Sequence, residues 1–155
     1  MLDLVNKGVS VNDQINAVVK AKTAGITTSV TVILGLGGKT LSERHAVNTG
    51  KAATRMNPDY FAALTLMIVP GTPLDEMIKR GEFEPVTDPL AILKELELMI
   101  LNIDSPGPVL FRTNHASNYL PLKGTLPADK AMLLETIRNA LKNPGLLRTE
   151  SSRGL

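Results

Sequence analysis

The sequence predicts an α/β domain in which helices alternate with short parallel strands. Residues 28–34 and 60–69 are apolar or β-branched segments of strand length, and each lies between segments with helical spacing. Three glycines, at positions 35, 37 and 38, directly follow the first of these strands. In parallel sheets, ligands bind beyond the carboxyl ends of the strands, where such turns lie. The glycine-rich turn is therefore the first candidate for a functional site.

Capping signals mark the starts of the first two helices. Ser10 and Asp13 form an S-x-x-D pattern ahead of the first helical stripe. Thr40 and Glu43 form a second start of this kind, and the helix that follows ends before Pro58.

The rest of the chain continues the alternation. Thr-Pro and Asp-Pro pairs open a short helix over residues 72–81 and a longer helix from residue 88. Residues 108–112 are expected to form a brief third strand, and residues 114–124 a polar loop. A final helix is expected over residues 127–141, because its apolar residues recur at helical spacing.

This pattern indicates part of a larger domain. Residues 60–69 are almost all apolar, which is typical of a parallel strand covered on both faces. Three parallel strands are few for a sheet, and the first helix has no strand before it. We therefore expect residues 1–142 to form the C-terminal half of a β/α domain, with residues 143–155 as a flexible tail.

Composition narrows the function classes. The net charge is only +2, the basic residues are scattered and aromatic residues make up 3% of the chain, so nucleic acid is not an expected partner. The absence of cysteine excludes disulfides and thiolate metal sites within this chain. No secretory leader and no apolar segment of membrane-spanning length is visible, so we expect a cytoplasmic protein without membrane contact.

Two nucleotide-binding motifs fit the glycine-rich turn only in part. A P-loop pattern aligns with residues 38–40 (G-K-T), but Ile33 occupies the position of its first glycine. The dinucleotide fingerprint fits Gly35 and Gly37, but Thr40 stands where its third glycine belongs. A tight turn that binds no ligand is the remaining interpretation.

A dense polar segment follows the third strand. Arg112, Asn114 and His115 belong to it, and in a β/α barrel this position faces the mouth of the active site. Two interpretations remain for these side chains: they contact a substrate, or they cap nearby backbone groups of the loop. His45 is expected to be half-buried packing on its helix and not a metal ligand.

Four segments together resemble the later part of a radical S-adenosylmethionine (radical SAM) domain. The similarity is to the iron–sulfur oxidoreductase subgroup, with relatives among elongator-like and coproporphyrinogen-oxidase-like proteins. The segments that carry it are L-V-N-K-G at 4–8, V-T-V-I-L-G-L-G-G-K at 30–39, L-T-L-M-I-V-P-G-T-P-L at 64–74 and F-R-T-N-H-A-S-N-Y-L-P-L-K-G at 111–124. The resemblance implies a partial (β/α)₆ barrel of the TIM type, with residues 28–34 and 60–69 as its fifth and sixth strands.

The resemblance also implies a surface for the adenine of SAM. The fifth-strand motif of the family, G-x-I-x-G-x-x-E, is matched by Ile33 and Gly35, while Thr31 replaces its first glycine and Gly38 its glutamate. In the complete enzyme, Gly35→Val is then expected to obstruct SAM by filling space that the adenine needs.

The end of the implied sixth strand completes this surface. Val69 and Pro70 would approach the adenine from another side, and Arg112, Asn114 and His115 would face the substrate. An apolar side chain and bare backbone groups suit a flat ring with polar edges.

The family holds a [4Fe–4S] cluster with three cysteines in C-x-x-x-C-x-x-C, and this chain has no cysteine. The expectation is therefore a fragment of a radical SAM enzyme that is inactive alone, binds no iron and binds SAM weakly or not at all. In its complete form the enzyme would cleave SAM reductively to a 5′-deoxyadenosyl radical. Its expected partners are the missing N-terminal half-barrel and a small-molecule substrate. The alternatives are a stand-alone α/β binding or interaction module and a P-loop-like nucleotide-binding module.

Overall fold

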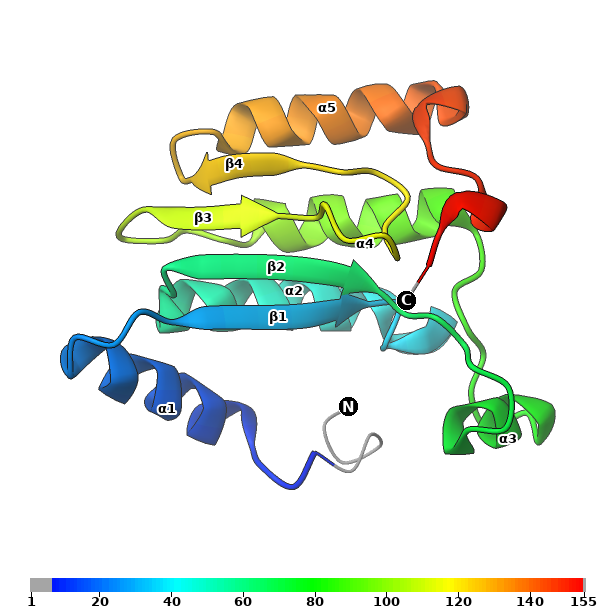
Figure 1. Cartoon of the computed structure of the whole chain (residues 1–155), viewed down its shortest axis with the longest axis horizontal. Helices are drawn as coiled ribbons and strands as arrows, with labels where there is room; N and C mark the ends of the chain where they lie inside the picture. Colours follow the sequence, from blue (N-terminus) through cyan, green and yellow to red (C-terminus); the bar gives the residue numbers. More distant parts are fainter. Residues whose placement is uncertain (1–6, 155) are drawn as a thin grey trace.

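The computed structural model describes residues 7–154 and contains one four-stranded sheet with helices packed against it (Figure 1). The strands lie in the order β1-β2-β3-β4; β1, β2 and β3 are parallel, and β4 is antiparallel to β3. The strands are β1 (Ser29–Leu34), β2 (Tyr60–Thr65), β3 (Val109–Arg112) and β4 (Lys123–Leu126). The helices are α1 (Val11–Thr23), α2 (Gly38–Met56), α3 (Pro73–Lys79), α4 (Pro89–Leu101) and α5 (Lys130–Lys142).

The predicted α/β class is confirmed, but the prediction of parallel strands throughout is wrong for β4. The sequence pattern predicts a loop over residues 114–124 and no strand after it, whereas β4 begins within the last two residues of that loop. The hydroxyl of Thr113 accepts the backbone N–H of Leu122 at 2.8 Å and donates to the carbonyl of Leu120 at 2.7 Å. These bonds turn the chain back sharply after β3, and a short connection of this kind joins antiparallel strands only. The sheet is therefore open and mixed, and a closed or partial barrel is not seen in the described residues.

The second strand is shorter than predicted. β2 ends at Thr65, so residues 66–69 of the apolar segment continue as irregular chain. The backbone N–H of Thr65 donates to the hydroxyl of Ser117 at 3.2 Å, and that of Leu66 still donates to the carbonyl of Leu34 at 2.9 Å. The loop after β3 therefore takes the place of further strand pairing on one side of β2.

Predicted helix starts are confirmed where a side chain caps the helix. Ser10 and Asp13 form a reciprocal capping box on α1, and Thr72 and Asp88 accept backbone N–H groups at the starts of α3 and α4. The expected start of α2 at Thr40 is wrong, because α2 begins two residues earlier without a side-chain cap.

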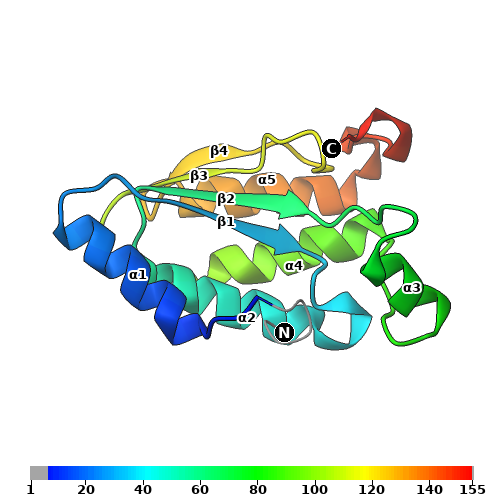
Figure 2. The same cartoon turned by 60° about the horizontal axis from the view of Figure 1, so that its bottom comes forward.

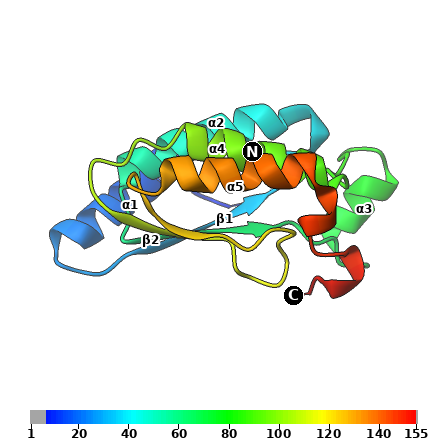
Figure 3. The same cartoon turned by 90° about the horizontal axis from the view of Figure 1, so that it is seen from above.

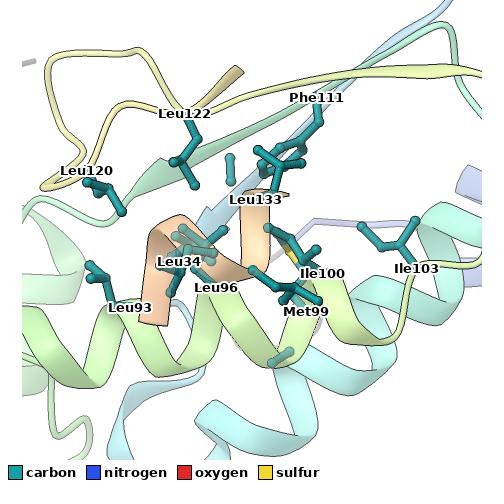
Figure 4. Close-up of a cluster of buried hydrophobic side chains, with 14 of the residues drawn as sticks. Leu34, Leu93, Leu96, Met99, Ile100, Ile103, Phe111, Leu120, Leu122 and Leu133 are labelled. Carbon is teal, nitrogen blue, oxygen red and sulfur yellow. The ribbon is translucent and has the colours of Figure 1, made fainter. Parts of the chain in front are cut away.

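Helices α2, α4 and α5 cover one face of the sheet (Figure 3). Alternate strand residues point into this layer, and they include Leu34, Phe61, Phe111 and Leu126, which are at most 2% exposed. The inner stripe of α4 lies beneath this face, and Figure 4 shows it with Leu34 and Phe111 of the sheet. Its core members are Leu93, Leu96, Met99 and Ile100. The hydrophobic core thus lies between the sheet and this single helix layer.

A glycine allows α2 and α4 to approach closely. A Cβ atom at Gly50 would lie 2.5 Å from the carbonyl oxygen of Met99 and 2.8 Å from the Cβ of Asn102. Real Cβ atoms do not approach a carbonyl oxygen so closely, so the crossing depends on the missing side chain.

Residues 143–154, which were expected to form a flexible tail, fold back onto the loop after β3 in this structure. They contain the short 3₁₀ turns η1 (Pro144–Leu146) and η2 (Glu150–Ser152). The guanidinium of Arg153 lies over the ring of Tyr119 at 3.9 Å from its centroid, and donates to the carbonyl of Ser117 at 2.7 Å. Burial, followed by the hydrogen bond to Glu150, raises the pKa of Tyr119 to about 12. Residue 155 lies outside the described residues.

Candidate functional site

Three segments meet at the carboxyl edge of the parallel strands: residues 35–38, residues 66–72 and residues 113–122. Every residue that the sequence singled out for ligand contact lies in these segments or at the adjacent strand ends. The edge therefore collects the candidate site, as expected for parallel strands.

A buried glutamate holds the glycine-rich turn. Glu95 of α4 is 3% exposed, and its Oε1 accepts the backbone N–H of Gly35 at 2.9 Å. The same carboxyl group accepts the hydroxyl of Ser42 and lies 2.9 Å from Nδ1 of His45. One side chain therefore ties the turn to the first two turns of α2.

Sequence reasoning missed Glu95. Gly35 lies 60 residues and Ser42 lies 53 residues before Glu95 in the chain, so no local sequence motif reveals these contacts. The available signal was a lone acidic residue on an otherwise apolar helical stripe, because buried carboxyl groups are rare unless they are hydrogen-bonded. The expectation that His45 is half-buried packing is consistent with its place beside this carboxyl group.

Backbone geometry explains two of the glycines. Gly35 has φ +80° and Gly38 has φ +57°, a region that side-chain-bearing residues rarely adopt. A Cβ atom at Gly38 would lie 2.8 Å from the carbonyl oxygen of Glu84. The glutamate of the radical SAM motif therefore does not fit at position 38 of this turn.

The structure gives a different reason for an effect of Gly35→Val from the one expected. A Cβ atom at Gly35 would point toward the helix layer, 3.1 Å from Cδ1 of Ile92 and 3.6 Å from the Cβ of Leu66. The substitution would strain the turn and press on Ile92 of the core.

The arrangement around Lys39 gives no support to a P-loop. Its backbone N–H donates to the carbonyl of Glu84 at 2.8 Å, and its Nζ lies 2.7 Å from Oε1 of the same residue. In a P-loop, the corresponding backbone and lysine groups are available to phosphate. Here a glutamate already occupies both groups.

The residues expected to contact adenine present apolar surface. Ile33 is the last residue of β1 on the uncovered face and pairs in register with Leu64 of β2. Ile33 is 38% exposed and Val69 is 40% exposed, while Pro70 is also exposed. The apolar side chains of this edge suit the face of a flat ring.

The polar loop after β3 divides into a structural part and an exposed part. Thr113, Ser117 and Asn118 are at most 2% exposed; Asn118 donates to the carbonyl of Ala63 at 2.8 Å and accepts the hydroxyl of Thr65 at 3.0 Å. These three residues fasten the loop across the end of β2.

The three residues that the sequence proposed for substrate contact are the exposed part of this segment. Arg112, Asn114 and His115 are all exposed. Nδ1 of His115 accepts the backbone N–H of Ser117 at 3.1 Å and lies 2.9 Å from its hydroxyl. The buried position of Ser117 leaves its hydroxyl without access to a substrate, so this pair serves the loop conformation.

No helix of the described residues covers the second face of the sheet, which Figure 1 shows from the front. The register sets its side chains in cross-strand rows. The first row is Ser29, Tyr60, Leu110 and Thr125; the second is Thr31, Ala62, Arg112 and Lys123; the third is Ile33 and Leu64. We call these ten positions the open face.

The outer edge of β1 is also open. In a parallel ladder every second residue pairs with a given neighbour. The carbonyl of Thr28 accepts the backbone N–H of Tyr60 at 3.0 Å, and that of Leu34 accepts the N–H of Leu66, just after β2, at 2.9 Å. The backbone groups of Ser29, Thr31 and Ile33 therefore point away from β2, and no partner for them is found among residues 7–154.

A groove of about 1220 Å³ runs along this edge. Figure 2 brings the β1 edge of the sheet forward, with β1 as the outermost strand on that side and α1 beside α2. The walls of the groove are residues 7–14, the outer strand β1 and the near side of α2. Val30, Val32 and Met56 contribute apolar surface to it.

Within residues 7–154, no group of three or more His, Cys, Asp or Glu side chains is placed to hold a metal ion. None of the described helices has both the length and the apolar character needed to cross a membrane. Comparisons of the chain with protein-family models, curated proteins and solved structures found no match.

Proposed function

We propose that this chain is the C-terminal part of a radical SAM barrel of the iron–sulfur oxidoreductase type. In that arrangement the open face lines the interior of the barrel, and a further parallel strand pairs with the outer edge of β1. The observation that carries the proposal is the coincidence of these two features on one sheet. In complete domains, the apolar face of a sheet is usually packed against another layer, and its edge strands are usually covered or blunted.

The composition of the open face supports this proposal. It carries Tyr60 and Ile33, which are 40% and 38% exposed, beside polar side chains. Mixed apolar and polar side chains are typical of a ligand-lined interior.

The residues present fit only one of the two implied cofactors. The cysteine-free chain offers no thiolate for a [4Fe–4S] cluster, so the cysteines would come from the preceding half. The exposed apolar side chains of Ile33, Val69 and Pro70 would suit the adenine of SAM. In the complete protein, the cluster and SAM would supply reductive cleavage chemistry. The chain's own residues would orient the adenine and shield it from water.

The direct test is to express the complete reading frame and look for a C-x-x-x-C-x-x-C motif ahead of Met1. After anaerobic reconstitution with iron and sulfide, 5′-deoxyadenosine is measured in the presence of SAM and dithionite. We expect a bound cluster and 5′-deoxyadenosine. A reading frame without the cysteines, or a reconstituted protein that makes no 5′-deoxyadenosine, contradicts the proposal.

A matched pair of variants tests the adenine surface. Ile33 and Ser29 lie on the same face of β1 at opposite ends. Ile33→Asp buries a carboxylate against the adenine and should raise the KM for SAM at least about tenfold, whereas Ser29→Asp should not. Equal KM values for the two variants would remove Ile33 from the site.

The competing proposal is a stand-alone α/β binding or interaction module. A continuous core that joins the sheet to α2, α4 and α5 favours it. This proposal predicts that the 155-residue chain unfolds cooperatively on its own. It also predicts that this segment unfolds at the same denaturation midpoint within the longer protein.

A further inference from the structure

Two basic side chains stand opposite each other on the open face. The antiparallel register pairs Arg112 of β3 with Lys123 of β4. Their strand neighbours Phe111 and Gly124 are buried on the helix side, so Arg112 and Lys123 point to the other face, and both are exposed. Directly opposite residues in such a pair have Cβ atoms about 4.5–5.5 Å apart.

Neither of these cations has an acidic partner in residues 7–154. No hydrogen bond or ion pair is found for the side chain of Arg112 or Lys123 there. Some other basic residues do have such partners: Lys22 pairs with Asp59, Lys130 with Asp104, and Arg138 with Glu97. The ten positions of the open face include no aspartate or glutamate.

The rest of this row leaves room for a ligand. Ala62 lies beside Arg112 in register, and Thr31 lies beside Ala62. The methyl side chain of Ala62 takes up little room beside Arg112, and Thr31 adds a hydroxyl on the far side of Ala62. Like charges directly opposite each other destabilise a sheet. An anion bound between Arg112 and Lys123 would therefore reduce the repulsion between these two side chains.

We propose that Arg112 and Lys123 form a binding site for the anionic group, a carboxylate or phosphate, of a small-molecule substrate. This inference rests on the proposed function, because that function places the open face inside a barrel. In such an interior, two cations without a counter-ion are costly, and the planar guanidinium fork suits a carboxylate or phosphate.

The first test follows anion binding to the whole 155-residue chain by NMR. Labelled protein is titrated separately with inorganic phosphate and with succinate, which distinguishes a phosphate site from a carboxylate site. We expect saturable shifts of the Arg112 Nε signal and of the β3 and β4 amides with at least one anion. Arg112→Gln and Lys123→Gln should each weaken binding about tenfold.

The matched control is Lys94→Gln, which removes one exposed charge from α4 in the helix layer. It should leave the anion affinity unchanged. Shifts that spread evenly over the basic residues, or an equal effect of Lys94→Gln, would overturn the inference. Thermal unfolding of each variant confirms that the fold is retained.

The second test separates this inference from the proposed function. If the longer protein makes 5′-deoxyadenosine but Arg112→Gln and Lys123→Gln leave the KM of its substrate unchanged, only the anion site fails. If the chain binds the anion but the reading frame lacks the cysteine motif, only the radical SAM proposal fails. A carboxylate from the preceding half that pairs with both cations would also overturn the anion site.

Discussion

The two faces of the sheet differ in almost every physical respect. On the covered face, Phe61, Phe111 and Leu126 are at most 1% exposed and pack against a continuous layer of helices. On the open face, hydroxyls, basic groups and half-exposed apolar side chains stand in rows, and no helix within residues 7–154 lies over them. The buried side chains that stabilise the fold therefore lie on one face of the sheet. The other face is left available for a ligand or for further chain.

The largest expected contrast is between adjacent residues of β3. Phe111 lies on the covered face and is 0% exposed, whereas Leu110 lies on the open face. Phe111→Ala should lower the free energy of unfolding by about 3–5 kcal/mol because it leaves a cavity. Leu110→Ala should lower it by about 1 kcal/mol or less. Denaturant titration of both variants measures the contrast, and similar losses would mean that the open face is also a core.

A second prediction concerns the helix layer alone. Gly50→Ala forces a methyl group against the carbonyl oxygen of Met99, so it should cost about 1–3 kcal/mol of unfolding free energy. The control is Gly145→Ala, because a Cβ atom there meets nothing within 4 Å and φ is not positive. An unchanged denaturation midpoint for Gly50→Ala would show that α2 and α4 are less close than described.

A third prediction concerns the buried carboxyl group behind the glycine-rich turn. Glu95→Gln keeps the shape but replaces one acceptor oxygen with a donor, so the backbone N–H of Gly35 or the hydroxyl of Ser42 loses its acceptor on residue 95. The loss should be about 1–3 kcal/mol of unfolding free energy. Amide exchange at Gly35 should accelerate as well.

The control for this variant is Glu135→Gln on α5, where the side chain is exposed. It should change the unfolding free energy by less than about 0.5 kcal/mol. Equal behaviour of the two glutamine variants would show that Glu95 does not hold the turn.

The smallest expected effect has the opposite sign. Lys123→Glu places opposite charges across from each other on the open face, so the isolated chain should gain about 0.2–1 kcal/mol of unfolding free energy. The same variant should lose the phosphate or succinate binding of the chain. A gain in stability together with unchanged anion binding would separate the charge pair from any ligand role.

The sequence correctly predicted the helices and strands that are stabilised by interactions between residues close together in the chain. The caps at Ser10, Thr72 and Asp88 and the β-branched strand β1 are properties of neighbouring residues, and the structure confirms them. The strand β4 was missed because its four residues, K-G-T-L, have weak strand propensity and pair only after the Thr113 turn.

The sequence predicted the residues at the candidate site but not the buried residue that holds the glycine-rich turn in place. The sequence placed Ile33, Gly35 and Arg112 at strand ends, since a strand followed by glycines or polar residues is a local pattern. Glu95 could not be found in this way, because its contact with Gly35 joins residues 60 positions apart. The face to which each strand residue points depends on register, which only the folded sheet determines.

The most direct measurement of the central claim is amide hydrogen exchange along β1. In the 155-residue chain, Val30 and Val32 should exchange slowly because they pair with β2, while Thr31 and Ile33 should exchange rapidly at the open edge. In the protein made from the complete reading frame, a further strand should slow Thr31 and Ile33 and leave Val30 and Val32 slow. Equal protection of all four amides in the 155-residue chain, or no change at Thr31 and Ile33 in the longer protein, would contradict the account.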